Sequence, residues 1–150
     1  MPKAHLYKFC LTLLLVFGLF SCVGCGSAPK GPTLKGTVVL PPNVKLEEND
    51  SASVVFVPDG TEGELFAASI NPSDLSFSTK GSPGKGIVPG KYKVTVNLQP
   101  YVPGESKQKQ IFDTINTRYD TANSRLMYQV TSEPEQSITI DLNKGTVTRQ

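Results

Sequence analysis

The stretch GKYKVTVNL at residues 90–98 decides the fold class, because its apolar and polar side chains alternate without interruption. Successive side chains of a β-strand point to opposite faces, so this period of two predicts a half-buried strand. The residues expected to face the core are Tyr92, Val94, Val96 and Leu98. The intervening polar residues are expected to face water, where lysines discourage pairing with other chains.

Similar short apolar patterns recur on both sides of this strand, separated by turn residues. The chain of 150 residues contains 13 glycines and 12 prolines, which favours frequent turns over long helices. We therefore predict an all-β protein whose folded domain, residues 34–150, is a seven-stranded antiparallel β-sandwich. The seven predicted strands are residues 34–40, 53–58, 64–70, 75–79, 90–98, 125–131 and 137–142.

Residues 100–124 interrupt this rhythm, because they contain no clean strand pattern. Their large apolar side chains have helix-like spacing (Ile111, Phe112, Ile115 and Tyr119). The intervening Thr114, Asn116 and Thr117 are weak helix formers, so we predict a long ordered loop, with a short helix as the alternative. The apolar content indicates that this loop is packed, with Tyr119 as a partly exposed anchor at the sandwich edge.

The N-terminus has the composition of a secretory signal. Lys3 and Lys8 precede an uncharged apolar run, Phe9–Phe20, which ends at a small residue. A basic segment, a short apolar segment and a small residue at the cut site are typical of a cleaved signal peptide, here residues 1–21. The run is shorter than the about 20 residues that a membrane-spanning helix needs.

The cysteines that follow this run suggest a lipid anchor. Residues 19–22 read LFSC and resemble the lipobox of bacterial lipoproteins, with a leucine three positions before the cysteine and a small residue directly before it. The resemblance implies cleavage before Cys22, a diacylglycerol on its thiol and an acylated amino group. More than one acyl chain is needed for stable anchoring. Cys25 remains the alternative, because Gly24 also places a small residue before a cysteine.

A lipid on either cysteine would attach the domain to a membrane through residues 22–33. Residues 26–33 read GSAPKGPT, a composition typical of a flexible tether. The expected location follows: secretion across the inner membrane and anchoring in the cell envelope, at the outer membrane. The membrane is then the first expected partner.

Metal and catalytic chemistry receive little support from composition. The Cys22-x-x-Cys25 pair cannot complete a four-ligand zinc site alone, because the third cysteine, Cys10, and the single histidine, His5, lie in the signal. Without histidine the mature chain lacks the usual general base at neutral pH. We therefore predict no catalytic residues, no metal site, no cofactor and no enzyme activity.

Charge points away from nucleic acid. The chain carries 15 basic and 13 acidic residues, and removal of Lys3 and Lys8 with the signal leaves 13 of each. A neutral mature protein without a basic patch is not expected to bind nucleic acid.

Two polar stretches are weak candidates for binding. Asp59, Glu62 and Glu64 could form a cation site, but their spacing lacks the ladder of oxygen ligands of a calcium loop and fits a solvated turn better. Residues 105–110, ESKQKQ, could contact an anionic lipid or polysaccharide, or form a solvated loop. The sequence assigns no ligand-binding residue.

Several stretches together resemble carboxypeptidase-regulatory-like, transthyretin-like domains and small planctomycete lipoproteins that carry them. The resembling stretches are GTVVL (36–40), SVVFVP (53–58), GSPGKGIVPGKYKVTV (81–96) and the segment 115–142. The resemblance spans almost all of residues 10–142 and implies a transthyretin-like, Greek-key sandwich at the cell surface. Many relatives carry D-x-D-G-x-F where this chain has Asn71–Phe77, with one aspartate and no glycine, so a calcium role does not carry over.

These observations lead to an expected function. We expect a lipid-anchored cell-envelope protein that acts as a non-catalytic structural or binding module. The alternative is a carbohydrate- or peptide-binding accessory protein with a defined ligand. An envelope protein or a polysaccharide is the expected partner in either case.

The choice of cysteine leads to a first prediction. The wild-type chain will sediment with membranes and incorporate a palmitate analogue, and Cys22→Ser will abolish both. Cys25→Ser is the matched control and will change neither. A loss confined to Cys25→Ser would move the lipid to that residue, and retention of both properties in each variant would disprove the lipoprotein interpretation.

Overall fold

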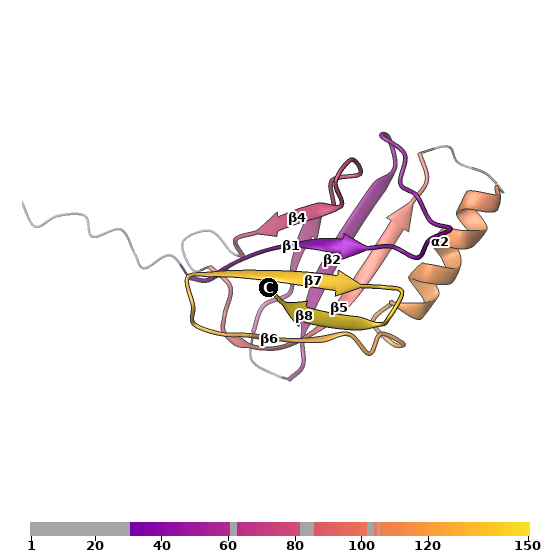
Figure 1. Cartoon of the computed structure of the whole chain (residues 1–150). Coiled ribbons are helices and arrows are strands. Elements are labelled where there is room, and N and C mark those ends of the chain that lie inside the picture. The colour runs from indigo at the N-terminus through magenta and orange to yellow at the C-terminus, as the bar shows by residue number, and fades with distance from the viewer. Residues whose placement is uncertain (1–30, 61–62, 82–85, 102–103, 105) are drawn as a thin grey trace, which may run out of the picture.

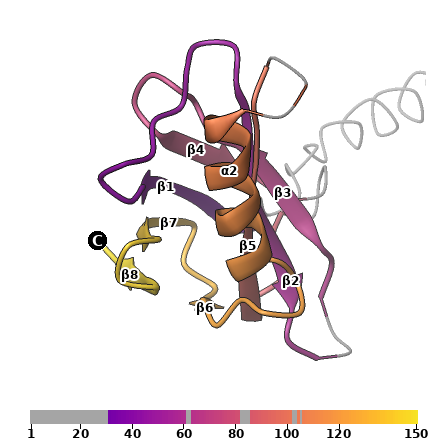
Figure 2. The same ribbon diagram turned by 90° about the vertical axis from the view of Figure 1, so that its right-hand side faces the viewer.

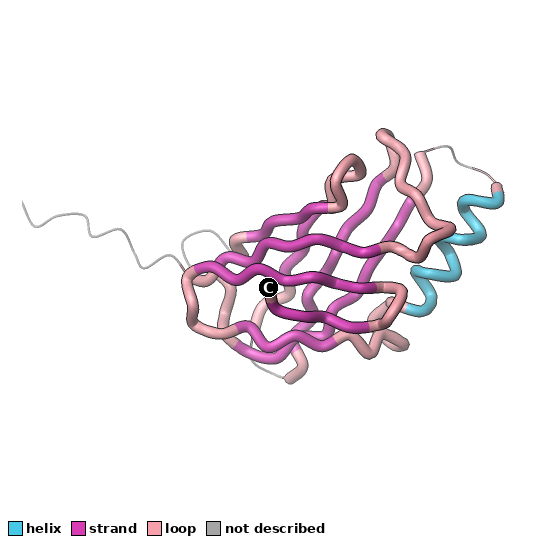
Figure 3. Tube along the Cα trace, viewed as in Figure 1, coloured by secondary structure: helices cyan, strands magenta, loops and turns pink. Residues whose placement is uncertain are grey.

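Two β-sheets packed face to face form the body of the protein. The computed structural model describes residues 31–60, 63–81, 86–101, 104 and 106–150, and Figures 1 and 3 show the two layers of strands. The expectation of an all-β sandwich is confirmed at this level. The strands are β1 (Thr33–Val39), β2 (Ser51–Pro58), β3 (Phe66–Ser69), β4 (Ser76–Thr79), β5 (Gly90–Gln99), β6 (Met127–Val130), β7 (Glu135–Asp141) and β8 (Thr146–Arg149).

The strand order corrects two details of the sequence prediction. One sheet has the order β4-β1-β7-β8 and the other β3-β2-β5-β6, so the described residues form eight strands rather than seven. The sheets are not purely antiparallel, because β1 and β7 pair in parallel from Thr33↔Glu135 to Val39↔Asp141. A parallel pair requires a crossover connection, and here the chain forms β2 to β6 between the two strands.

The missed strand, β8, follows a tight turn. The carboxylate of Asp141 accepts hydrogen bonds from the backbone N–H groups of Asn143 (3.0 Å) and Lys144 (2.9 Å). Gly145 then adopts a φ of +70°, a conformation that glycine reaches without steric cost. Val147 is the one apolar residue of β8, so the strand shows no alternating pattern and only its turn residues could have indicated it.

The core lies between the sheets and follows the alternation read from the sequence. Tyr92, Val94, Val96 and Leu98 of β5 are all buried, as predicted. The rings of Phe56 and Phe66 stack beside them with centroids 4.7 Å apart. One polar residue of β5 departs from expectation: Thr95 is only 8% exposed. Its hydroxyl donates to the carbonyl of Val55 on the neighbouring strand at 3.4 Å.

Residues 107–118 form a helix, α2 (Lys107–Arg118), so the prediction of a loop is wrong. The alternative, a short helix, is correct in type, but the helix is longer than expected, with 12 residues. Ser106 caps the helix by accepting a hydrogen bond from the backbone N–H of Lys109 at 3.1 Å. Phe112 and Ile115 are buried, and the helix packs beside β5, as Figure 2 shows. This burial outweighs the weak helix propensity of the threonines and the asparagine.

Helix α2 and the following residues complete the outer edge of β5. Strand β2 covers one side of β5, but on the other side β6 pairs only with Gly90–Lys93 and leaves the second half of that edge without a strand. There the backbone N–H of Val94 donates to Leu126 O (2.8 Å) and that of Val96 to Tyr119 O (3.1 Å). These two carbonyl groups occupy backbone N–H groups of β5 that no strand pairs with on this edge. The edge is therefore not free to pair with a strand of another chain.

Asn116 supplies the remaining contacts of this edge. Its Oδ1 accepts the backbone N–H of Leu98 at 2.7 Å, and its Nδ2 donates to the Leu98 carbonyl at 2.8 Å. The amide group thus takes the place of a residue in a neighbouring strand, since it offers one donor and one acceptor in the same plane.

The turn at Asn71–Phe77 is built from side chains instead of glycine. Asn71 Oδ1 accepts the N–H of Ser73 (3.1 Å), and Asp74 Oδ1 accepts the N–H of Ser76 (2.9 Å). The hydrogen bonds from Ser76 hold the pKa of Asp74 below its usual value. Leu75 has a φ of +58°, the left-handed conformation that glycine favours, at the position of the glycine in the D-x-D-G-x-F pattern.

The paired contacts of Asn116 lead to a second prediction. Asn116→Ala will leave the N–H and carbonyl of Leu98 without partners and lower the free energy of unfolding by about 1–3 kcal/mol. Urea melts will measure it. Thr117→Ala, on the exposed face of the same helix, is the control and will be neutral or slightly stabilising, because alanine favours helix. Equal midpoints for the two variants would contradict the assigned role of Asn116.

Candidate functional site

The two ends of the sandwich are built from different elements. Strand β1 starts at one end, and helix α2 lies across the other, next to residues 40–50 that connect β1 to β2 (Figures 1 and 2). We call this second end the distal end. It combines the helix with residues 40–50, which belong to no strand.

A groove runs along helix α2 where residues 41–47 face it. It consists of two adjoining hollows of about 470 and 270 Å³, which share Asn43, Val44 and Ile111. Lys107 lines one hollow and Arg118 the other, at opposite ends of the helix. We call this feature the helix–loop groove. Its apolar floor with charged ends suits binding of an extended partner that carries both kinds of group.

Asp50 holds the walls of this groove together. Its side chain is almost buried, at 7% exposure for the residue, and it accepts hydrogen bonds from three segments. Asp50 Oδ2 accepts the backbone N–H of Glu47 (2.8 Å) and the side-chain amide of Gln108 (2.8 Å), and Oδ1 accepts the N–H of Tyr101 (3.0 Å). One carboxylate therefore connects the loop, the end of β5 and the first turn of α2.

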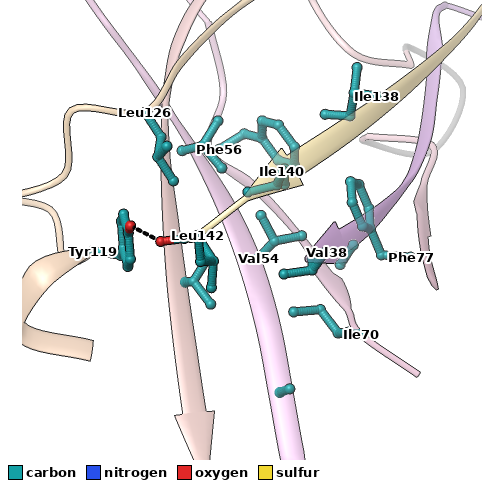
Figure 4. Close-up of a cluster of buried hydrophobic side chains, with 14 of the residues drawn as sticks. Val38, Val54, Phe56, Ile70, Phe77, Tyr119, Leu126, Ile138, Ile140 and Leu142 are labelled. Atoms are coloured by element: carbon teal, nitrogen blue, oxygen red, sulfur yellow. Dashed lines mark hydrogen bonds between the residues drawn. The ribbon is translucent and has the colours of Figure 1, made fainter. Parts of the chain in front are cut away.

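Tyr119 fixes the other end of the helix. The prediction that it is packed is confirmed, although it is fully buried at 4% exposure instead of partly exposed. Its hydroxyl donates to the carbonyl of Leu142, directly after β7 (Figure 4). Burial raises the pKa of Tyr119 above its usual value, with a smaller opposing effect of the adjacent Arg118. The phenol therefore stays a hydrogen-bond donor at neutral pH.

The acidic residues considered for a cation do not form a described site. Asp59 forms an ion pair with Lys91 at 3.0 Å, Glu64 is exposed, and Glu62 lies outside the described residues. In the described part of the chain, no group of three or more histidine, cysteine, aspartate or glutamate side chains could hold a metal ion.

The polar run at residues 105–110 divides between cap and helix. Glu105 lies outside the described residues, Ser106 is the helix cap, and α2 starts at Lys107. Lys109 forms an ion pair with Asp113 at 2.6 Å, one turn further along. Only Lys107 of the two lysines reaches the groove.

The proposed anchor cannot be placed in the structure. The signal (1–21), Cys22, Cys25 and the tether up to residue 30 lie outside the described residues, so lipidation stays a prediction. Within the described ranges, no helix has the length and apolar character needed to cross a membrane.

Comparisons with models of protein families, with curated proteins and with solved structures gave no match to this chain. The site is therefore argued from its own geometry. Sequence reasoning missed Asp50 and Asn116, which position the groove. An aspartate before a strand is a common turn residue, and nothing in its neighbourhood distinguishes one that is buried.

The geometry of Asp50 leads to a third prediction. Asp50→Asn will lower the free energy of unfolding by about 1–3 kcal/mol, because an amide has one oxygen and must turn its NH₂ toward at least one of the donors. Denaturant melts will measure the loss. Glu48→Gln, an exposed change in the same loop, is the control and will be neutral. An Asp50→Asn midpoint equal to that of the control would show that the carboxylate is not required.

Proposed function

We propose that this chain is a lipid-anchored cell-envelope protein whose sandwich is a non-catalytic binding or structural module that presents its distal end to a partner. The observation that carries the proposal is the position of the helix–loop groove. It lies at the end of the sandwich opposite to the start of β1, through which an N-terminal anchor would be attached (Figure 1).

The distance between anchor and domain supports this arrangement. Strand β1 starts at Thr33, 11 residues after Cys22. An extended chain spans at most about 3.5 Å per residue, so this tether would hold the start of β1 within about 40 Å of the bilayer. The groove lies at the opposite end of the sandwich, so it is farther from this attachment than the start of β1 is.

The fold supports a family assignment within the proposal. Two packed four-stranded sheets, with strands close in sequence divided between them, are compatible with the transthyretin-like, carboxypeptidase-regulatory-like, Greek-key sandwich that the sequence resembles. The absence of any histidine beyond His5 favours a role without acid–base catalysis. Outer-membrane location is part of the same proposal.

A carbohydrate- or peptide-binding accessory protein with a defined ligand is the second candidate. The specific observation in its favour is the size of the groove, since its hollows of about 470 and 270 Å³ are comparable to sites that hold small ligands. A polysaccharide or a segment of an envelope protein would occupy the groove in this case.

Distance from the membrane tests the proposal. The lipidated chain with Cys25→Ser is reconstituted in vesicles, and a fluorophore is attached at Lys35→Cys near the start of β1 or at Thr114→Cys on α2. Lipids with nitroxide-labelled headgroups will quench the fluorophore at position 35 more strongly than at position 114, because only the former lies near the tether.

The same two labelled proteins, purified as residues 22–150 with Cys22→Ser so that neither signal nor lipid is present, serve as controls and will show no quenching at either position. Stronger quenching at position 114 would mean that the groove faces the bilayer and would overturn the distal presentation. Quenching that survives Cys22→Ser would overturn the lipid anchor.

A further inference from the structure

A third hollow lies beside the C-terminal end of α2, and unlike the helix–loop groove it has no acidic residue in its lining. It has a volume of about 330 Å³. Three cationic side chains from different segments line it: Arg118 at the end of α2, Arg125 before β6, and Lys144 in the β7–β8 turn. We call this hollow, with Asn123 and Leu126 in its wall, the basic pocket.

Two of these cations have no anionic partner among the described residues. Arg118 and Arg125 form no ion pair there, and the guanidinium of Arg118 lies over the ring of Tyr119, 5.4 Å from its centre. Lys144 contacts Asp141 at 3.3 Å, but its side chain remains 74% exposed. The pocket therefore has more positive than negative charge.

The carboxylates near the pocket are already engaged. Asp141 accepts the backbone N–H groups at the start of the turn, which hold its pKa below the usual value. Asp120 accepts the backbone N–H of Asn123 at 2.7 Å and its side-chain amide at 3.1 Å. Asp141 also pairs with Lys144, but among the described residues neither carboxylate forms an ion pair with Arg118 or Arg125.

The carbonyl groups at the helix end would repel an anion if they pointed freely into the pocket. Three of them accept hydrogen bonds instead. Ile115 O accepts the N–H of Tyr119 (2.9 Å), Thr117 O accepts the side-chain amide of Asn123 (3.0 Å), and Tyr119 O accepts the N–H of Val96 (3.1 Å). The last of these hydrogen bonds engages the carbonyl of Tyr119 with β5.

We propose that the basic pocket binds a small organic oxyanion, with a carboxylate or phosphate group held by Arg118 and Arg125 and supported by Lys144. A guanidinium matches either group with two parallel N–H donors. The volume, about 330 Å³, is at the lower end for small-molecule sites and suits a ligand of about one sugar ring. The inference rests on the binding role proposed above but not on the lipid anchor.

Titration calorimetry of the purified full chain in detergent at low salt tests the pocket. The probes are glucuronate, glucose 6-phosphate and glucose, which share one ring and differ in the anionic group. We expect binding of at least one of the two anions and none of glucose, and the preferred anion identifies the group. Arg125→Gln and Lys144→Gln will each weaken binding about tenfold or more.

Lys80→Gln is the matched control, because it removes one positive charge from an exposed lysine that lines neither the basic pocket nor the groove, and it will leave the affinity unchanged. Thermal melts will show that the exposed Arg125 and Lys144 variants remain folded. The proposal is overturned if neither anion binds more tightly than glucose, or if Lys80→Gln weakens binding as much as Arg125→Gln. Binding of anionic phospholipid vesicles by Cys22→Ser protein without binding of either free anion would also overturn it. None of these outcomes changes the quenching result that tests the anchor.

Discussion

The outer edge of β5 is the constraint on which the arrangement of the distal end depends. A β-strand buried in a sandwich must satisfy its backbone groups on both sides, and β6 covers only the first part of β5. The remainder is satisfied by a helix end, a loop and one amide side chain, from Asn116. Because these contacts are made by backbone and side chains of α2 and the residues after it, the position of the helix follows from the needs of the strand. The groove and the basic pocket are both formed on the surface that results.

Two further buried side chains hold helix α2 in place on the sandwich. Asp50 connects residues 40–50 with the first turn of α2, and Tyr119 connects the last turn with the end of β7. The helix is therefore fixed at both ends to different parts of the sandwich. A binding surface built in this way changes little in shape when a partner arrives, which lowers the entropic cost of association.

The sequence predicted the elements that depend on local pattern and missed those that depend on partners distant in the chain. The alternation in β5 identified its buried face correctly, because a period of two is visible in the residues themselves. Helix α2 was underestimated because its stability comes from packing on β5, which outweighs the propensity of Thr114 and Thr117. Strand β8 was missed because it carries only one apolar residue. The parallel pairing of β1 with β7 was missed because the two strands are far apart in the sequence and no short turn between them indicates the pairing. At the candidate site, Tyr119 could be recognised from the sequence as a packed aromatic residue. The role of Asp50 could not, because its hydrogen bonds join the loop before β2, the end of β5 and the first turn of α2, which are distant in the sequence.

The parallel pair of β1 and β7 has a mechanical consequence. Strand β1 lies between β4 and β7, and its register with β7 extends along its whole length. If the chain is held by its N-terminus while a partner pulls at the distal end, the load runs along β1 and stretches all of its inter-strand hydrogen bonds together in shear. A strand at the edge of a hairpin would instead open one bond at a time. A pull on the N-terminus would therefore act against both neighbours of β1 at once, so the domain would not unravel strand by strand from that end.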